Sequence, residues 1–100
     1  MKNYLIHRRR RVDGNHAIIK KAFEAMGFAM QDLSGIGKGC PDLAVSKHGQ
    51  TCLVEIKTED GDLTTKQEKF IERWRDVVQI VRTTDDVKRL DDLLWARRRI

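Results

Sequence analysis

Two short runs in the middle of the chain combine charged and aliphatic residues in the pattern of a β-hairpin. They cover residues 39–43 (GCPDL) and 53–57 (LVEIK), and the turn signal His-Gly-Gln lies between them at residues 48–50. Glycine at the first central position favours a two-residue type II′ loop made of Gly49 and Gln50. With that loop, Asp42 would lie directly opposite Lys57 on the other strand.

Alternation of side chains along the two strands separates charged from apolar residues. Asp42, Glu55 and Lys57 share one face, because every second residue of a strand points the same way. The other face is apolar: Leu43, Val45, Cys52, Val54 and Ile56. A slip of one residue would exchange the two faces, so the apolar pattern supports the same facing as the turn. The geometry suggests a metal-dependent nuclease.

Composition indicates one small domain. The 100 residues, 40% of them hydrophobic, suffice for a single compact domain over residues 1–100, with no repeat or Pro/Ser-rich linker. No apolar run reaches the roughly 18 residues of a membrane span, and the basic N-terminus does not continue into a secretory signal. We therefore expect a soluble cytoplasmic protein without membrane contact, whose two cysteines stay reduced.

Positive charge concentrates at the two ends of the chain. The net charge is +5, with four consecutive arginines near the N-terminus and three at residues 97–99. Polyanion binding is the natural inference, although solvated termini that only aid solubility are the alternative. Lys38, in a glycine-punctuated loop at residues 34–39, adds a fifth candidate. The expected DNA contacts are Arg8, Arg9, Arg10, Arg11 and Lys38.

Apolar periodicity predicts the remaining elements. In chain order they are a helix at 13–26, strands at 28–33 and in the two hairpin arms, a helix opening at 64–67, a strand at 77–82 and a helix at 85–95. This α-β-β-β-α-β-α order is that of an α/β fold. Helical spacing places Trp74 and Trp95 on apolar stripes, which favours a core or interface position over the alternative of a base-stacking platform. We expect the three histidines to be surface residues.

The elements and motifs resemble the PD-(D/E)XK nuclease superfamily. Residues 13–87 look most like its VRR-NUC branch, in particular the small stand-alone phage-type members. The residues that carry the resemblance are Asp42 after Pro41, Glu55 and Lys57 as Glu-x-Lys, and Gln67 in the next helix. The resemblance implies a restriction-endonuclease-like core, a mixed four-stranded sheet flanked by helices, and Mg²⁺- or Mn²⁺-dependent phosphodiester hydrolysis. It also implies branched DNA as a frequent substrate and suggests a phage origin in a bacterial host.

The expected chemistry follows from these residue types. Asp42 and Glu55 offer the oxygen ligands that Mg²⁺ takes, usually only one or two carboxylates per ion. The family pattern adds the backbone carbonyl of Ile56 as a third ligand. Lys57 would orient the attacking water or stabilise developing charge. Its alternative role is an ion pair with one of the two acids.

The first helix departs from the superfamily pattern. Members commonly carry an acid there that faces the metal, whereas the inward position here is Asn15, with Asp13 as the expected N-cap. An asparagine carbonyl can contact a hard cation without supplying charge, and Asp13 would supply the charge if the helix began later. Either Asn15 or Asp13 is therefore a further candidate ligand, and the number of metal ions stays open.

Gln67 has two interpretations. It lies inward at the start of its helix, where it can serve the site, but Thr64 and Gln67 also have the spacing of a capping box, in which each side chain bonds the other residue's backbone N–H. A variant that lowers stability without lowering the rate would favour the cap.

These features lead to a structure-selective DNA endonuclease, with Holliday-junction resolution as its specific form. Four-way junctions have two symmetry-related strands to cut, so such an enzyme would act as a C2 homodimer. One alternative is a nuclease acting on flap, linear or single-stranded DNA. The other, from a different class, is a non-catalytic DNA-binding module, which the arginine runs would explain by themselves.

Overall fold

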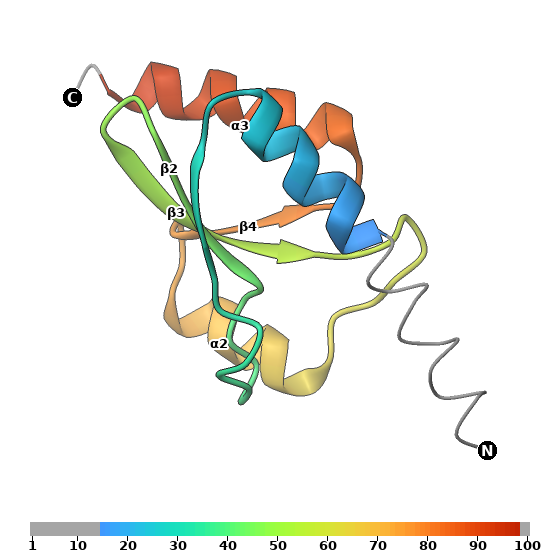
Figure 1. The fold of residues 1–100 in the computed structure, drawn as a ribbon. Coiled ribbons are helices and arrows are strands. Elements are labelled where there is room, and N and C mark those ends of the chain that lie inside the picture. Colours follow the sequence, from blue (N-terminus) through green and yellow to red (C-terminus); the bar gives the residue numbers. More distant parts are fainter. Residues whose placement is uncertain (1–14, 99–100) are drawn as a thin grey trace.

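The computed structural model describes residues 15–98 (Figure 1). Four of the sequence predictions lie outside these residues: Asp13 as the N-cap, Arg8 to Arg11 as DNA contacts, His7 as a surface residue, and Arg99 as the end of the basic C-terminal run. The described chain follows the predicted α-β-β-β-α-β-α order. Of its helices, none has both the length and the apolar character needed to cross a membrane.

The elements form a mixed four-stranded sheet with three helices. After a first helix at residues 15–25 come β1 (Ala29–Asp32), β2 (Leu43–Lys47), β3 (Gln50–Ile56), α2 (Thr65–Arg73), β4 (Val78–Val81) and α3 (Thr84–Arg97). The strands lie in the order β1-β2-β3-β4, antiparallel except for the parallel pair β3 and β4. The parallel pair is possible because α2 forms the crossover between its strands.

The core lies on one face of the sheet, under the first helix and α3 (Figure 1). Phe23 and Val54 are fully buried there, and each such side chain stabilises the fold by about 1.5–3 kcal/mol. The apolar stripe of α3 is buried as predicted, through Val87, Leu90 and Leu94. All five apolar residues of the hairpin face this core, so the predicted facing of the hairpin is confirmed.

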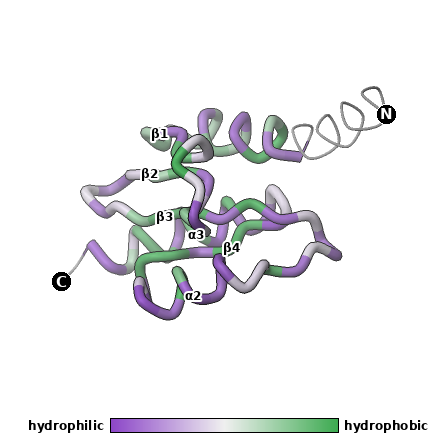
Figure 2. The backbone as a smooth tube through the Cα atoms, turned by 90° about the horizontal axis from the view of Figure 1, so that it is seen from below, coloured by the Kyte–Doolittle hydropathy of each residue, from purple (hydrophilic) through white to green (hydrophobic). Residues whose placement is uncertain are grey.

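Among residues 15–98, the helix on the opposite face of the sheet is α2, which buries no residue of its own. Figure 2 shows α2 as mostly hydrophilic beside the largely hydrophobic β3 and β4. The predicted core or interface position of the two tryptophans is wrong for the core: Trp74 is 46% and Trp95 51% exposed. Helical spacing indicates which side of a helix is apolar, but not whether another element covers that side.

The hairpin register differs from the prediction by two residues. Lys47 pairs with Gln50, so the loop consists of His48 and Gly49, with φ angles of 58° and 75°. Positive φ at both central residues is the requirement of a type I′ loop, and histidine tolerates it better than most residues. Because Leu43 pairs with Val54, the preceding Asp42 lies across from Glu55 and not from Lys57. A shift by two leaves every side chain on its predicted face.

A single carboxylate holds the tip of this hairpin on α3. Asp91 accepts a hydrogen bond from Lys47 Nζ at 2.9 Å and contacts His48 Nε2 at 2.6 Å. The imidazole also meets the ring of Trp95 edge-on, with centroids 5.0 Å apart. Although burial disfavours its charged form, the bonds from Lys47 and His48 hold the pKa of Asp91 below its usual range. We refer to Lys47, His48 and Asp91 as the hairpin-tip cluster.

Candidate active site

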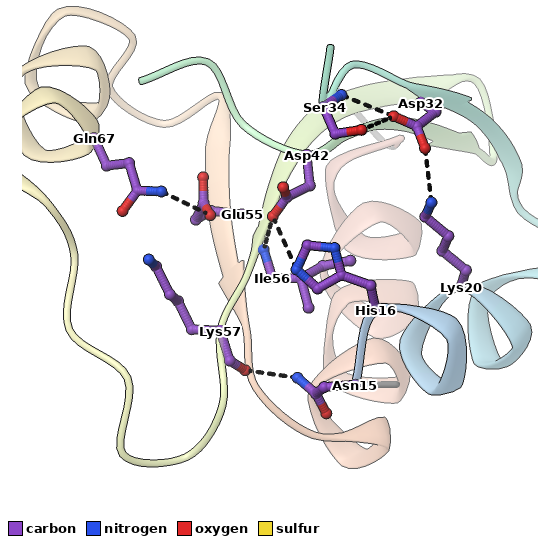
Figure 3. A network of polar contacts seen from close by, with 10 residues as sticks. All are labelled: Asn15, His16, Lys20, Asp32, Ser34, Asp42, Glu55, Ile56, Lys57 and Gln67. Carbon is purple, nitrogen blue, oxygen red and sulfur yellow. Dashed lines mark hydrogen bonds and ion pairs between the residues drawn. The ribbon is translucent and has the colours of Figure 1, made fainter. Parts of the chain in front are cut away.

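A cleft of about 330 Å³ opens on the α2 side of the sheet. Its walls come from the start of the first helix, the segment preceding β2, the end of β3 with the loop that follows, and the first turn of α2. It is lined by Asn15, His16, Asp42, Glu55, Ile56, Lys57, Thr58, Gly61 and Gln67. The hairpin residues, Gln67 and Asn15, named from sequence as site candidates, thus line one cavity (Figure 3).

Asp42 and Glu55 lie side by side in the cleft. Asp42 Oδ2 accepts the backbone N–H of Ile56 at 2.8 Å, which holds the aspartate against β3. Glu55 is only 3% exposed. Burial, and then the adjacent Asp42 carboxylate, raise the pKa of Glu55 to about 8, against a smaller opposite effect of Lys57. A cation bound between the two carboxylates would therefore stabilise their charged forms.

Gln67 links the site to the cap of α2. It forms both the capping contacts and a contact with the site. Its side-chain oxygen accepts a hydrogen bond from the backbone N–H of Thr64 at 2.8 Å. Its backbone N–H donates to Thr64 Oγ1 at 3.2 Å, which completes the capping box. Its amide Nε2 donates to Glu55 Oε2 at 3.2 Å. The cap occupies the amide oxygen and leaves the NH₂ group for the glutamate.

Gly39 sets the distance between the glycine-punctuated loop and α2. Its φ is +80°, and a Cβ at this position would lie 2.4 Å from the backbone oxygen of Lys66. No L-residue could occupy the position without moving either backbone. Lys66 immediately precedes Gln67, so this contact positions the amide that reaches Glu55. At Gly39 the loop thus comes close to the backbone of α2.

Lys57 directly follows the last residue of β3, and Figure 3 shows its ammonium pointing toward Gln67 and Glu55. Within residues 15–98 no ion pair joins Lys57 to either acid, so the alternative role inferred from sequence is not formed. The loop that continues from Lys57 is held by Arg82, whose Nη1 donates to the carbonyls of Thr58 at 2.7 Å and Gly61 at 2.6 Å. Arg82 thereby shapes one wall of the cleft.

The first helix contributes Asn15 and His16. Asn15 Nδ2 donates to the backbone carbonyl of Lys57 at 3.1 Å, so its amide group is directed at the β3 backbone (Figure 3). His16 Nε2 lies 3.9 Å from Asp42 Oδ2. The prediction of a surface histidine is wrong for His16, whose side chain is 20% exposed and lines the cleft, and for His48, whose side chain is 21% exposed and contacts Asp91. The available signal for His16 was its place three residues before the buried Ile19.

Lys38 lies outside the cleft. It is exposed, and with three basic residues and Phe70 of α2 it lines a separate groove. The glycine loop that carries it begins at Ser34, whose N–H and hydroxyl both donate to Asp32 (Figure 3). Asp32 in turn pairs with Lys20 of the first helix at 2.7 Å. Both ends of the loop are thus fixed, one on the first helix and the other on α2.

The donor set of the cleft suits a hard divalent cation. In the part of the chain that the structure describes, no three His, Cys, Asp or Glu side chains gather in a geometry that could hold a metal ion. Two adjacent carboxylates are nevertheless what Mg²⁺ usually takes from a protein, with water and phosphate oxygens as its other ligands. In a strand, the N–H and C=O of one residue point the same way. The Ile56 carbonyl therefore points toward Asp42, as its N–H does.

Comparison with known proteins agrees with this geometry. The family model described as the VRR-NUC domain matches residues 9–82. That range contains Asp42, Glu55, Lys57 and Gln67. Neither a curated protein nor a solved structure matches the chain. Because the match covers well over half of the chain and includes the whole cleft, the chain belongs to the VRR-NUC family of nuclease domains.

Proposed function

We propose that this VRR-NUC domain is a metal-dependent DNA endonuclease that hydrolyses phosphodiester bonds in the cleft. The observation that carries the proposal is the placement of Asp42 beside the buried Glu55. Among the described residues, neither carboxylate forms an ion pair with a lysine or arginine. A protein that only bound DNA would gain nothing from two adjacent acids, because they repel phosphate.

Asp42, Glu55 and the Ile56 carbonyl would hold one Mg²⁺ or Mn²⁺ ion. When bound there, the ion would lower the pKa of a water ligand and neutralise charge on the scissile phosphate. The Ile56 N–H fixes the Asp42 carboxylate, and Gln67 fixes that of Glu55. Both acids are thus oriented before any ligand arrives, which lowers the cost of binding.

Lys57 would act on the reacting groups themselves. Its ammonium points into the cleft beside Glu55 and Gln67 (Figure 3). From that position it can orient the attacking water or stabilise negative charge that develops on the phosphate. Its backbone carbonyl is held by Asn15, so the first helix also positions this lysine.

Asn15 or Asp13 remains the candidate for the contribution of the first helix to the metal. Asn15 lines the cleft, and its amide nitrogen is already used by Lys57. Its role as a ligand would fall to the carbonyl oxygen, as a contact without charge. A second ion would need a further charged group such as Asp13.

We further propose branched DNA as the substrate, Holliday junctions being the specific case, with a C2 homodimer as the active form. The domain is small, and two copies would place two clefts on the symmetry-related strands of a junction. Arg8 to Arg11 and Lys38 would contact the DNA backbone outside the cleft.

The test is cleavage of labelled four-way junction, flap, single-stranded and linear duplex DNA, with Mg²⁺, with Mn²⁺ or with EDTA, beside an Asp42→Ala control. We expect metal-dependent cutting that the control lacks, with paired symmetric nicks in the junction and a dimer in sedimentation. If cutting were confined to one of the other three DNA structures, that structure would be the substrate in place of the junction. Failure to cut any of the four would overturn the nuclease in favour of a binding module.

A further inference from the structure

A second surface lies next to the cleft, and the mechanism does not use it. It is a groove of about 260 Å³ between the glycine-punctuated loop and α2. Four cations and one aromatic ring line it: Lys38, Lys66, Lys69, Phe70 and Arg73. We call it the basic groove. Within residues 15–98 none of its four cations takes part in an ion pair.

Charge is sorted on the two sides of α2. Lys69 and Arg73 are four residues apart on the side of the basic groove, whereas Glu68 and Glu72 are four apart on another side, in a separate depression. Like charges at this spacing destabilise a helix, and alternating the signs would have formed stabilising pairs. A helix face that only kept the protein in solution would not need this separation. The separation leaves a surface whose charge suits an anion on the basic side.

An aromatic pair, of which Trp74 is the exposed member, borders the same groove. Phe70 lines it, and the ring of Trp74 stacks on Phe70 with centroids 5.3 Å apart and planes 5° from parallel. Trp74 is 46% exposed, so much of the side chain is open to a ligand. Cations that follow a backbone beside rings that stack on bases are the combination with which proteins bind single-stranded nucleic acid.

The basic groove and the cleft share the first turn of α2. Lys66 lies in the groove and meets Gly39 by its backbone, while the next residue, Gln67, donates to Glu55. Lys38, the residue before Gly39, also lines the groove. A strand held in the groove would therefore arrive beside the two acids.

We propose that the basic groove binds an unpaired segment of the DNA substrate, with its cations on the phosphates and Trp74 stacked on a base. In an intact duplex the faces of the bases are covered by their neighbours, so the exposed ring selects strands with unpaired nucleotides next to the cut. This inference rests on the proposed function, because it names the class of DNA that the same site takes.

Binding can be measured apart from cleavage. The chain has two tryptophans, so Trp95→Phe leaves Trp74 as the reporter, and EDTA prevents any metal-dependent reaction. In this background we expect a thymidine 12-mer to quench the fluorescence of Trp74 and a blunt duplex of the same length to leave it unchanged. Absence of quenching by the single strand, or equal quenching by the duplex, would overturn the inference.

The cations are tested by the salt dependence of binding. Lys69→Ala with Arg73→Ala should reduce the slope of log K against log salt by about 1.4, from about 0.7 for each lost phosphate contact to a single strand. The matched control is Lys21→Ala with Lys88→Ala, which removes two exposed lysines from the helices on the other face of the sheet. An equal reduction in both variants would overturn the groove as the binding surface.

Stacking is tested at Trp74 itself. Measured by the anisotropy of a fluorophore-labelled 12-mer, Trp74→Ala should weaken binding about tenfold, within the range of one base stack, while Trp74→Phe should restore most of it. Circular dichroism melts check that each variant folds. Equal weakening by alanine and phenylalanine would contradict a stack.

Cleavage separates this inference from the function on which it rests. Lys69→Ala with Arg73→Ala should raise KM for DNA that has unpaired nucleotides and leave kcat unchanged. If cleavage required metal while groove variants bound and cut normally, only the basic groove would be refuted. If the groove bound single strands but the protein cut nothing, the proposed nuclease would fall.

Discussion

The cleft and the hairpin-tip cluster contain similar residues, but the pKa of the acid is shifted in opposite directions in the two regions. Each combines acids with a lysine of the hairpin segment, although the acid at the tip, Asp91, comes from α3. At the tip, Asp91 is matched by Lys47 and His48, and its pKa is lowered. In the cleft, Asp42 and Glu55 face each other, and the pKa of Glu55 is raised to about 8. A carboxylate neutralised by its own protein stabilises the fold, whereas a pair that forms no ion pair with a lysine or arginine of the described residues is suited to bind a metal cation.

The largest effect should follow from the two lysines. Lys57→Ala should reduce cleavage by a factor of about a thousand, as the loss of a group acting on the transition state does, and leave the melting temperature nearly unchanged. Lys47→Ala should lower the melting temperature instead, because Asp91 and the Met26 carbonyl lose their donor. The measurements are the cleavage rate and the thermal melt of each variant. Full activity of Lys57→Ala would contradict the catalytic role assigned to Lys57.

Gly39→Ala tests whether the site depends on the position of α2. The added Cβ would meet the Lys66 carbonyl in a backbone conformation that alanine disfavours, so α2 and Gln67 must shift. A displacement of about 1 Å can cost about a hundredfold in rate, and we expect a loss of that order in steady-state assays. Gly35→Ala, where a Cβ meets nothing within 4 Å, is the control. Equal rates in the two variants would mean that α2 does not position the site.

The pH dependence of stability should have opposite signs in the two regions. The pKa of Glu55 is raised, so its folded state keeps a proton that the unfolded chain releases, and metal-free stability falls as pH rises from about 5 through about 8. The pKa of Asp91 is lowered, so its contribution is present above its ordinary pKa and is lost as pH falls below about 4. Denaturation in EDTA across this range measures both.

Substitution assigns each slope to its residue. Glu55→Gln should flatten the fall between pH 5 and 8, and Asp91→Asn should flatten the loss in acid. A wild-type protein whose metal-free stability does not change between pH 5 and 8 would contradict the account of Glu55.

Asp91→Asn should also destabilise the protein at neutral pH. Asparagine keeps one acceptor oxygen but no charge, so only one of Lys47 and His48 can keep its bond to this residue, and the change should cost about 1–3 kcal/mol, the usual cost of a partly buried polar group that loses its partner. Urea denaturation gives the value, and the exposed neighbour Asp92 supplies the control variant Asp92→Asn. The rate per folded molecule should stay at the wild-type level. A lower rate would tie the hairpin tip to catalysis.

The smallest effect distinguishes the two contacts of Gln67. Thr64→Ala removes the cap alone and should cost about 1 kcal/mol without changing the cleavage rate. Gln67→Ala should cost about the same stability and also lower the rate, since Glu55 loses its donor. Equal rates in the two variants would reduce Gln67 to a capping residue.

Much of this arrangement could be predicted from the sequence because strands and helices have fixed periods. Alternation placed Asp42, Glu55 and Lys57 on one face, and that facing is correct. It could not detect the register error, since a shift of two residues leaves the faces unchanged. The signal that would have corrected it is His48 before Gly49, a pair that accepts positive φ at both loop positions.

The features that could not be predicted depend on contacts distant in sequence. His16 enters the cleft because the first helix packs across the sheet, and Gly39 is needed because α2 returns to the loop. Trp74 is exposed because it ends α2, a helix that buries no residue of its own. Gln67 carries two contacts that its spacing presented as alternatives. Local patterns predicted each of these elements, while their packing decided the roles of these residues.

The most direct test of the central claim compares metal binding in the two regions. Binding of Mn²⁺ without DNA, followed by electron paramagnetic resonance of the free ion, should show a site in the wild type and in Asp91→Asn, and none in Asp42→Asn. Binding that survives Asp42→Asn, or that is lost in a folded Asp91→Asn protein, would contradict the assignment of the cleft as the metal site.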